Sequence, residues 1–568
     1  MADTAGWRER AEDSALLWAL VAIVAILSLL PLARLLFEGI APAGRFSTVA
    51  LSDVLTSATT WTAARHSLVT ACGGTLLAVL IVATVAVLVA LTDIRGRNAF
   101  VFCFVLPLMI APQVVALAWL QLFGPSSTLL KMVGLAPPMG SPNPLYSAEG
   151  IILLLGVQYA PLVFLTLRAG LRTLPQELLE AGLAAGARPL TILRTIVLPL
   201  MTPPLVAGIA LCFVSCLGNF GIAAFLGIPG NYLVLPTLIY QRLAGLGPSV
   251  LSEVAVLSML IGFIAVLGIF LQDLMLRRRD FRITTTSNAM RPFELKRWRP
   301  VVEAGLWALS IVVLVLPLIA LLLTSLVPAI GVPLTAQTAT LANYDYVLFD
   351  HAAAKRAFVN SISLSATAAI VIVLIAVPLA YFLVWRRSRL LRLLNLIAEM
   401  PYALPGVVLA IAAILVFLKP LPLLGVSLYN TVWIILFGYL ARFLVLGLRP
   451  VIGGYYQLDR TLEEAAQIAG ARLLRRLSTI ILPLVAPMAT AGALLVFLTA
   501  FNELTVSALL WSSGAETLGV VVFSFQQGGD STYAAALAML TVAVTIALML
   551  STLFTAGTPA RGVLPWRG

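Results

Sequence analysis

Long uninterrupted apolar runs constrain this chain more than any other feature of its sequence. Twelve runs of 19 to 27 residues carry almost no charge, and only 11% of the whole chain is charged, against about 25% in soluble domains. A helix of about 20 apolar residues crosses a hydrocarbon core roughly 30 Å thick. The runs therefore predict an all-α polytopic membrane protein with about 12 transmembrane helices. The expected spans are 15–37, 67–91, 99–122, 150–170, 204–226, 250–276, 302–326, 360–384, 394–418, 430–448, 486–510 and 532–556.

The distribution of basic residues predicts the orientation. With the N-terminus in the cytoplasm, 27 of the 36 Lys and Arg residues fall in cytoplasmic loops and tails. Positive residues near the ends of spans favour the cytoplasmic side. We therefore expect a multi-pass protein with both termini in the cytoplasm. The net charge of +12 then reflects loops held against the membrane, and no nucleic-acid partner is needed to explain it.

A short polar segment between apolar runs occurs twice. Glu180-Ala-Gly-Leu-Ala-Ala-Gly186 and Ile196-Val-Leu-Pro199 recur 284 residues later, as Glu464-Ala-Ala-Gln-Ile-Ala-Gly470 and Ile480-Ile-Leu-Pro483. The offset is half of the 568 residues. It predicts two tandem six-helix halves, 1–284 and 285–568, joined by the basic segment 277–300. An even number of spans per half gives both halves one orientation, so a pseudo-two-fold axis should run along the membrane normal.

Each copy of the segment has the pattern of a short helix followed by a turn. In the second copy, Thr461 and Glu464 have the spacing of a capping box, and Gly470 suits the left-handed turn that ends a helix. Pro175 and Gly186 take the same places in the first copy. Small side chains allow a partner to approach closely. We therefore expect two equivalent docking loops, 172–199 and 456–483, for a partner of two-fold symmetry.

The doubled pattern resembles the cytoplasmic signature loop of permease subunits of binding-protein-dependent ABC importers. The resemblance implies the type I ABC importer permease fold, in a multi-pass protein of the bacterial inner membrane. It also implies that a soluble substrate-binding protein delivers the cargo, and that two copies of an ATPase subunit dock on the loops. The implied docking residues are Glu180, Ala181, Gly182 and Gly186 in the first half, and Glu464, Ala465, Ala466 and Gly470 in the second.

The chain has no phosphate-binding loop of the G-x-x-x-x-G-K-[ST] type. We therefore expect a transporter subunit that is not itself an enzyme, holds no cofactor or metal, and leaves ATP and magnesium to its partners. An ion-coupled secondary transporter is the alternative from another class, because twelve spans in two parallel halves also describe that group. A membrane-embedded enzyme is a third possibility, but no cluster of catalytic side chains supports it.

The fused halves are most similar to ferric-iron permeases, and this resemblance implies ferric iron as cargo. Permeases for 2-aminoethylphosphonate, thiamine and polyamines remain alternatives. Polar residues inside spans usually face a cavity or a partner, and they give the candidates for the translocation path. Paired prolines in the third span of each half predict kinks around this path. The path candidates are Gln113, Gln158, Asn219, Arg442, Asn502 and Glu503.

Overall fold

The computed structural model describes residues 2–138, 140–172, 174–245, 247, 249–277, 293–386, 388–420 and 425–555. Helices make up nearly all of the regular structure in these residues, and one isolated bridge joins Thr92 to Phe293. Ten helices are long and apolar enough to cross a membrane, or up to twelve if each sharply bent pair counts as one span. The all-helical polytopic fold predicted from the sequence is confirmed. The boundary expected at 284/285 lies outside the described residues.

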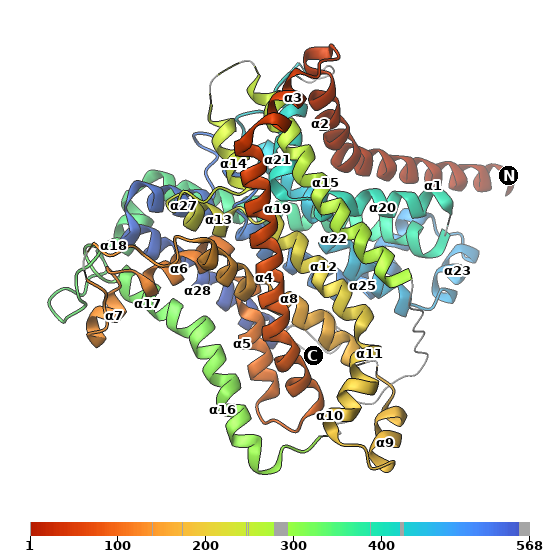
Figure 1. Ribbon diagram of the computed structural model, residues 1–568. Helices are drawn as coiled ribbons and strands as arrows, with labels where there is room; N and C mark the ends of the chain where they lie inside the picture. Colours follow the sequence, from red (N-terminus) through yellow and green to blue (C-terminus); the bar gives the residue numbers. More distant parts are fainter. Residues whose placement is uncertain are drawn as a thin grey trace.

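The helices of the two halves follow one another in the same order (Figure 1). The first half contains α1 (Ala2–Val24), α2 (Leu30–Ile40), α3 (Val49–Thr56), α4 (Ala58–Leu91), α5 (Arg97–Met109), α6 (Pro112–Phe123), α7 (Thr128–Val133), α8 (Ala148–Arg172), α9 (Gln176–Ala184), α10 (Pro189–Ile192), α11 (Leu198–Leu200), α12 (Thr202–Leu217), α13 (Gly221–Gly227), α14 (Leu235–Leu243) and α15 (Val250–Arg277). The second contains α16 (Arg299–Ser310), α17 (Leu316–Ser325), α18 (Ala342–Asp345), α19 (Ala352–Tyr381), α20 (Arg389–Ala403), α21 (Gly406–Phe417), α22 (Val432–Gln457), α23 (Thr461–Ile468), α24 (Leu473–Arg476), α25 (Leu482–Phe501), α26 (Ser507–Leu510), α27 (Leu518–Gly528) and α28 (Ser531–Thr555).

Three long helices form the centre of each half. In the first half α4, α8 and α12 pack against one another, and in the second half α19, α22 and α25 do the same. Glycines allow the close approaches: a Cβ on Gly492 of α25 would lie 3.0 Å from the carbonyl oxygen of Gly447 on α22. Small residues of this kind bring membrane helices together because van der Waals packing drives their association.

The first span of each half packs on the other half. Helix α2 lies against α21, and α17 lies against α6. Helix α16 likewise contacts α5 of the first half, where Trp307 meets the ring of Phe100 edge-on. The two halves are thus interlocked, with each one holding a helix of the other.

Four expected spans are broken, so their prediction as continuous helices is wrong. The runs 99–122 and 394–418 each divide at a proline: α5 ends before Pro112, and α20 and α21 meet at Leu404–Pro405 with a bend of 106°. The runs 204–226 and 486–510 divide after Leu217 and Phe501. Proline lacks the N–H that an uninterrupted helix needs, and the residue before it disfavours helical backbone. The expected kinks are therefore full breaks.

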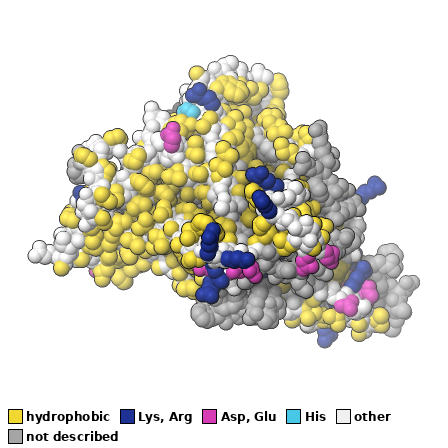
Figure 2. Space-filling view, turned by 60° about the horizontal axis from the view of Figure 1, so that its bottom comes forward, with side chains coloured by type: hydrophobic (Ala, Val, Ile, Leu, Met, Phe, Trp, Pro, Cys, Tyr) yellow, Lys and Arg dark blue, Asp and Glu magenta, His cyan; other side chains and the backbone are white. Residues whose placement is uncertain are grey.

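The outer surface of the described helices is apolar. Equivalent positions of α4 and α19 point outward: Leu76 and Leu80 are 61% exposed, and Ile370 and Leu374 are 61% and 66% exposed. Figure 2 shows a face covered largely by hydrophobic side chains, with basic and acidic side chains gathered toward its lower part. This is the surface expected of a protein whose sides contact lipid.

Candidate functional site: the docking loops and the centre between the halves

The two docking loops fold alike. Helix α9 is followed by Gly186 at φ +77°, and α23 is followed by Gly470 at φ +78°. In the first loop the N–H of Ala187 donates to the carbonyl of Gly182, and in the second the N–H of Ala471 donates to that of Ala466, both at 3.0 Å. Only glycine adopts this left-handed turn without strain. The helix and turn predicted for each loop are confirmed.

One local prediction is wrong. Thr461 does not cap α23, and Glu464 does not complete a capping box. Instead the carboxylate of Asp459 accepts a hydrogen bond from the N–H of Thr461 at 3.0 Å. Glu464 pairs with Arg460 at 3.1 Å across an exposed helix surface. The hydrogen bonds at Thr461 lower the pKa of the Asp459 carboxyl, as expected for an acid whose charged form caps a helix.

Both loops present matching surfaces to solvent. Six of the eight expected docking residues are exposed, and the other two, Gly182 and Ala466, are half-buried at equivalent places. Exposed leucines also match: Leu178 and Leu462 are 46% and 49% exposed, and Leu190 and Leu474 are 56% and 62% exposed. The same acidic and apolar pattern therefore appears in both loops.

Beneath the docking helices the two halves differ in chemistry. In the second half Glu463 and Arg476 form a buried ion pair at 3.2 Å, with side chains 6% and 1% exposed. The Tyr381 hydroxyl donates to Glu463 at 3.0 Å. Leu179 and Ile192 take the equivalent places in the first half, and both are buried. A Cβ on Gly182 would lie 3.2 Å from Ile192, so close packing explains why this loop carries glycine where the other carries Ala466.

Each docking loop leads directly into a long helix. In the second half Leu473–Phe501 is one helix of 29 residues, and in the first half Pro189–Leu200 and Thr202–Leu217 meet at 65°. A π-helical turn lies at the same place in each, Leu193–Val197 and Leu477–Ile481. The sequence predicted a docking loop that ends at Pro483 and a separate span that begins at 486. The structure shows instead that the second arm of the docking loop continues into that span.

The far ends of these helices lie at breaks that polar side chains stabilise. The carbonyl oxygen of the Asn219 side chain accepts from the N–H of Ile222 at 2.8 Å. The Glu503 carboxylate accepts from the N–H groups of Val506 and Ser507 at 2.8 and 3.1 Å. Both residues are nearly buried, and both satisfy backbone donors that a broken helix exposes. Asn219 and Glu503, paired in the sequence, thus begin equivalent short helices.

Three further candidates lie at the contacts around these breaks. The Gln158 side chain donates to the carbonyls of Pro107 and Ile110 at the end of α5, at 2.9 and 3.3 Å. The Gln113 side chain donates to the carbonyl of Asn502 at 3.2 Å. The Asn502 side chain in turn donates to the carbonyl of Met109 at 3.1 Å. A fifth-span break of one half therefore packs on a third-span break of the other.

Arg442 lies at the break in the third span of the second half, between α20 and α21. It lies on α22 at the place that Gln158 occupies on α8. A Cβ on Gly406 would fall 1.4 Å from its Nη1, so the guanidinium fills the space over the first residue of α21. This Nη1 is buried and has no hydrogen-bond partner among the described residues. Gly218, at the end of α12, approaches Pro405 at the same break.

The sequence did not predict two features of this region, the buried pair of Glu463 and Arg476 and the helix breaks. Glu463 and Arg476 had the appearance of ordinary loop charges, although their replacement by Leu179 and Ile192 in the other copy signals a contacting pair. The breaks after Leu217 and Phe501 were not predicted, and those in the third spans were predicted only as kinks, because hydropathy averages over a proline or glycine. Within the described residues, no three His, Cys, Asp or Glu side chains are placed to hold a metal ion together.

Comparison with known proteins is consistent with this architecture. The family described as "binding-protein-dependent transport system inner membrane component" matches residues 82–285 and again 372–557. A probable ABC transporter permease, y4fN of Sinorhizobium fredii, is 28% identical over 457 residues, which are 78% of each chain. The ferric transport system permease FbpB of Actinobacillus pleuropneumoniae is 26% identical over 82% of this chain and 66% of its own length.

A shorter match is to PhnU of Salmonella typhimurium, a putative 2-aminoethylphosphonate transport system permease. It is 37% identical over 98 residues, which are 17% of this chain and 34% of that protein. The doubled family match covers more than half of the chain, and each match contains one docking loop. The ion-coupled carrier and the membrane enzyme are therefore set aside. The chain belongs to the binding-protein-dependent transport system inner membrane components, and it is a permease of the ABC importer class, with both permease halves fused in one polypeptide.

Proposed function

We propose that this chain forms both halves of the transmembrane part of an importer in the inner membrane, driven by two separate ATPase subunits. The observation that carries the proposal is the doubled docking surface. Two loops of the same backbone geometry present an exposed acid and two exposed leucines each. Exposed apolar side chains that recur in register are typical of a protein interface. Two copies of one ATPase would fit such a pair.

The coupling follows from the way each loop is attached. In the second half one helix of 29 residues runs from the docking loop to Phe501, a length of about 43 Å. Asn502 and Glu503 follow at once, at the break that contacts the first half. A rigid helix transmits a push at one end to the other. Closure of the ATPase pair would thus move the contacts between the halves and open the path alternately to each side.

For the cargo we propose ferric iron, delivered by a soluble binding protein. The support is the similarity to FbpB over 82% of this chain. Gln113, Gln158, Asn219, Asn502 and Glu503 would line or frame the path, since they surround the contacts where the halves meet. Their amide and carboxylate oxygens are hard ligands. The oxygens of Asn219 and Glu503 accept backbone N–H groups here, so a passing ion would meet these two only when the breaks separate.

A second cargo is favoured by Arg442. Its guanidinium lies over the first residue of α21, and the N-terminus of a helix also carries partial positive charge. An anionic group between them would be stabilised by both. The match to PhnU names a class of cargo with such a group, 2-aminoethylphosphonate. We therefore keep a phosphonate as the alternative to ferric iron.

The test is ligand-stimulated ATP hydrolysis by the chain reconstituted with its ATPase and binding protein. Ferric ion, 2-aminoethylphosphonate, thiamine and putrescine would be compared as ligands. ATP hydrolysis stimulated by ferric ion alone supports iron. Stimulation by the phosphonate, lost in Arg442→Gln, supports the alternative. Stimulation by ferric ion that is unchanged in Arg442→Gln would remove Arg442 from the path.

The docking loops are tested one at a time. Glu464→Arg should lower the ratio of co-purified ATPase to permease from two toward one, and Glu180→Arg combined with it should abolish the complex. Asp53→Arg is the matched control, since Asp53 is an exposed acid on α3, outside both loops. Full ATPase content in the double variant would refute the docking assignment.

A further inference from the structure

An open basin beside the start of the first docking loop is lined by four arginines. It holds about 580 Å³ and lies between the start of α5, the end of α8 and the start of α16. Arg95, Arg97, Arg172 and Arg299 line it together with Asn98, and no acidic side chain is part of the lining. None of the expected docking residues and none of the path candidates is part of its lining.

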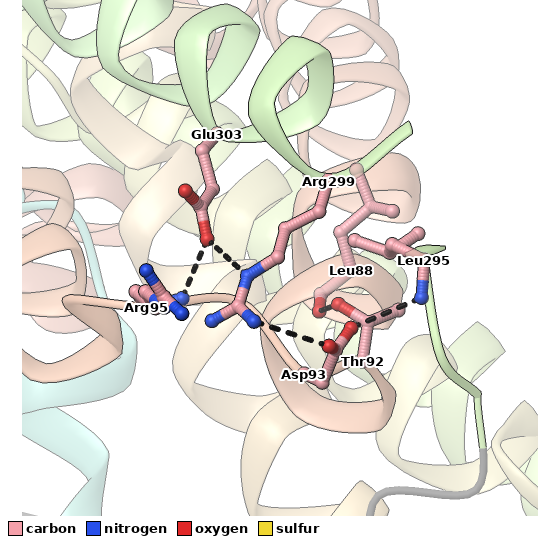
Figure 3. Close-up of polar contacts among 7 residues, drawn as sticks. All are labelled: Leu88, Thr92, Asp93, Arg95, Leu295, Arg299 and Glu303. Atoms are coloured by element: carbon pink, nitrogen blue, oxygen red, sulfur yellow. Dashed lines mark hydrogen bonds and ion pairs between the residues drawn. The ribbon is translucent and has the colours of Figure 1, made fainter. Parts of the chain in front are cut away.

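The wall beside Arg299 is held in place by two carboxylates. Arg299 donates to Glu303 at 2.9 Å and to Asp93 at 3.4 Å. The N–H of Arg95 donates to Glu303 at 2.7 Å, and that of Leu295 donates to Asp93 at 3.0 Å. Figure 3 shows these contacts linking the turn after α4 to the start of α16. Both carboxylates are therefore engaged in contacts at the wall of the basin.

The remaining charge is positive. Arg299 is paired with these two carboxylates. Arg168 lies one turn before Arg172, is 5% exposed, and is repelled electrostatically by Arg172 and Arg97. No hydrogen bond or ion pair of the Arg95 or Arg172 guanidinium is found among the described residues. A bound anion would relieve this repulsion.

The backbone adds to the same field. Gly96, at φ +68°, precedes the 13-residue helix α5, and no side chain caps this helix. The first residues of α5 line the basin, so the N–H groups of its first turn and the positive end of its dipole are near the arginines. This combination of arginine side chains and a helix N-terminus is suited to phosphate oxygens.

The position of the basin indicates where a phosphate would come from. Trp298, next to Arg299, is 59% exposed, and Val301 one turn on is 60% exposed. Tryptophan is enriched where a membrane meets water, and α16 presents apolar residues beyond it. Basic pockets between spanning helices are typical sites for anionic head groups. We propose that the basin binds the phosphate of an anionic phospholipid, whose acyl chains lie along α16.

The binding would have a consequence for coupling. Arg172 ends α8 at the beginning of the first docking loop, Arg95 lies in the turn between α4 and α5, and Arg97 is the first residue of α5. One head group would connect these segments to α16 of the second half. The lipid would thus stabilise the docking-loop face where the two halves meet.

The experiment uses the full chain in nanodiscs of phosphatidylcholine with or without phosphatidylglycerol, and native mass spectrometry counts the lipid retained. Arg95→Gln with Arg172→Gln should weaken retention of phosphatidylglycerol by about fivefold per arginine, or about 30-fold together. Arg299 is left intact because it holds the wall. Arg389→Gln with Arg392→Gln is the control, since both are exposed at the corresponding start of α20.

Three outcomes decide the proposal. Loss of retention in the basin variant alone supports it, and recovery with Arg95→Lys and Arg172→Lys would show that charge is the cause. Equal loss in basin and control variants would overturn it, because general attraction of basic side chains would then suffice. Retention of inorganic phosphate by the protein in phosphatidylcholine discs, without any preference for phosphatidylglycerol, would overturn the lipid as the source of the phosphate. The basin would then be assigned to a soluble anion.

Discussion

Glu463 and Arg476 show how two copies of one segment can solve the same packing problem with different chemistry. The second half buries an ion pair where the first half buries Leu179 and Ile192. Removing one partner of a buried pair is costly, whereas replacing both by apolar residues is often neutral. We expect Glu463→Gln alone to destabilise the fold by about 3–5 kcal/mol, and Glu463→Leu with Arg476→Ile to be nearly neutral. Thermal unfolding in detergent measures both, and a double variant as unstable as the single one would contradict this account.

Glu516 provides a pH-dependent contact at the start of α19. Burial raises the pKa of its carboxyl, but hydrogen bonds from Arg356, at 3.1 and 3.3 Å, and from the N–H of Gly514 outweigh it, so the net shift is downward. A lowered folded pKa means stability that is present above the ordinary value of 4.5 and is lost as the pH falls through the folded value. We expect acidification from pH 7 to about 4 to lower the unfolding temperature less in Glu516→Gln than in the natural protein. Equal decreases of the unfolding temperature in the two proteins would show that this contact does not contribute to the pH dependence.

At the scale of residues, the sequence predicted which side chains lie at the site better than it predicted what those side chains contact. Asn219 and Glu503 were found as polar residues inside expected spans, but their hydrogen bonds to Ile222 and Val506 depend on helix breaks that hydropathy does not reveal. Conversely, the left-handed turns at Gly186 and Gly470 follow directly from the need for a residue without a Cβ.

At the scale of helices, the contact between α22 and α25 sets how firmly the second docking loop is tied to the core. A Cβ at Gly492 would already lie 3.0 Å from the carbonyl oxygen of Gly447. A valine at this position would therefore clash with the backbone of α22. We expect Gly492→Val to cost about 1–3 kcal/mol and to weaken coupling between ATP hydrolysis and transport. Gly453→Val on α22 is the control, because a Cβ there meets nothing within 4 Å. Equal unfolding temperatures for the two variants would contradict the prediction.

The existence of most helices followed from the sequence because length and hydropathy suffice to define a span. Where helices stop did not follow. Pro112 and Pro405 cause breaks, whereas Pro161 and Pro378 lie inside continuous helices. Neighbouring helices decide which proline is tolerated, and that information lies in packing that the local sequence does not contain.

At the scale of the whole molecule, interlocking should make the linker dispensable. Helices α2 and α17 each pack on the other half, so covalent continuity adds little to an interface already formed. We expect fragments 1–284 and 285–568, produced together, to co-purify through a tag on either one. The control is a pair cut at 425, within a loop of the second half, which separates α19 from α22. Failure of the 284/285 pair to associate would show that the exchange of helices does not hold the halves together.

The exchange of first spans also has a consequence for how the protein is made. Helix α2 ends at Ile40, but α21, on which it packs, begins at Gly406, so 366 residues must be synthesised before they can meet. At about 5–20 residues per second, α2 waits in the bilayer for roughly 20–70 s without this neighbour. The N-terminal half cannot reach its final packing before α21 of the second half has been synthesised. Its maturation depends on the last third of the message, and a premature stop there would leave even the earliest helix exposed to quality control.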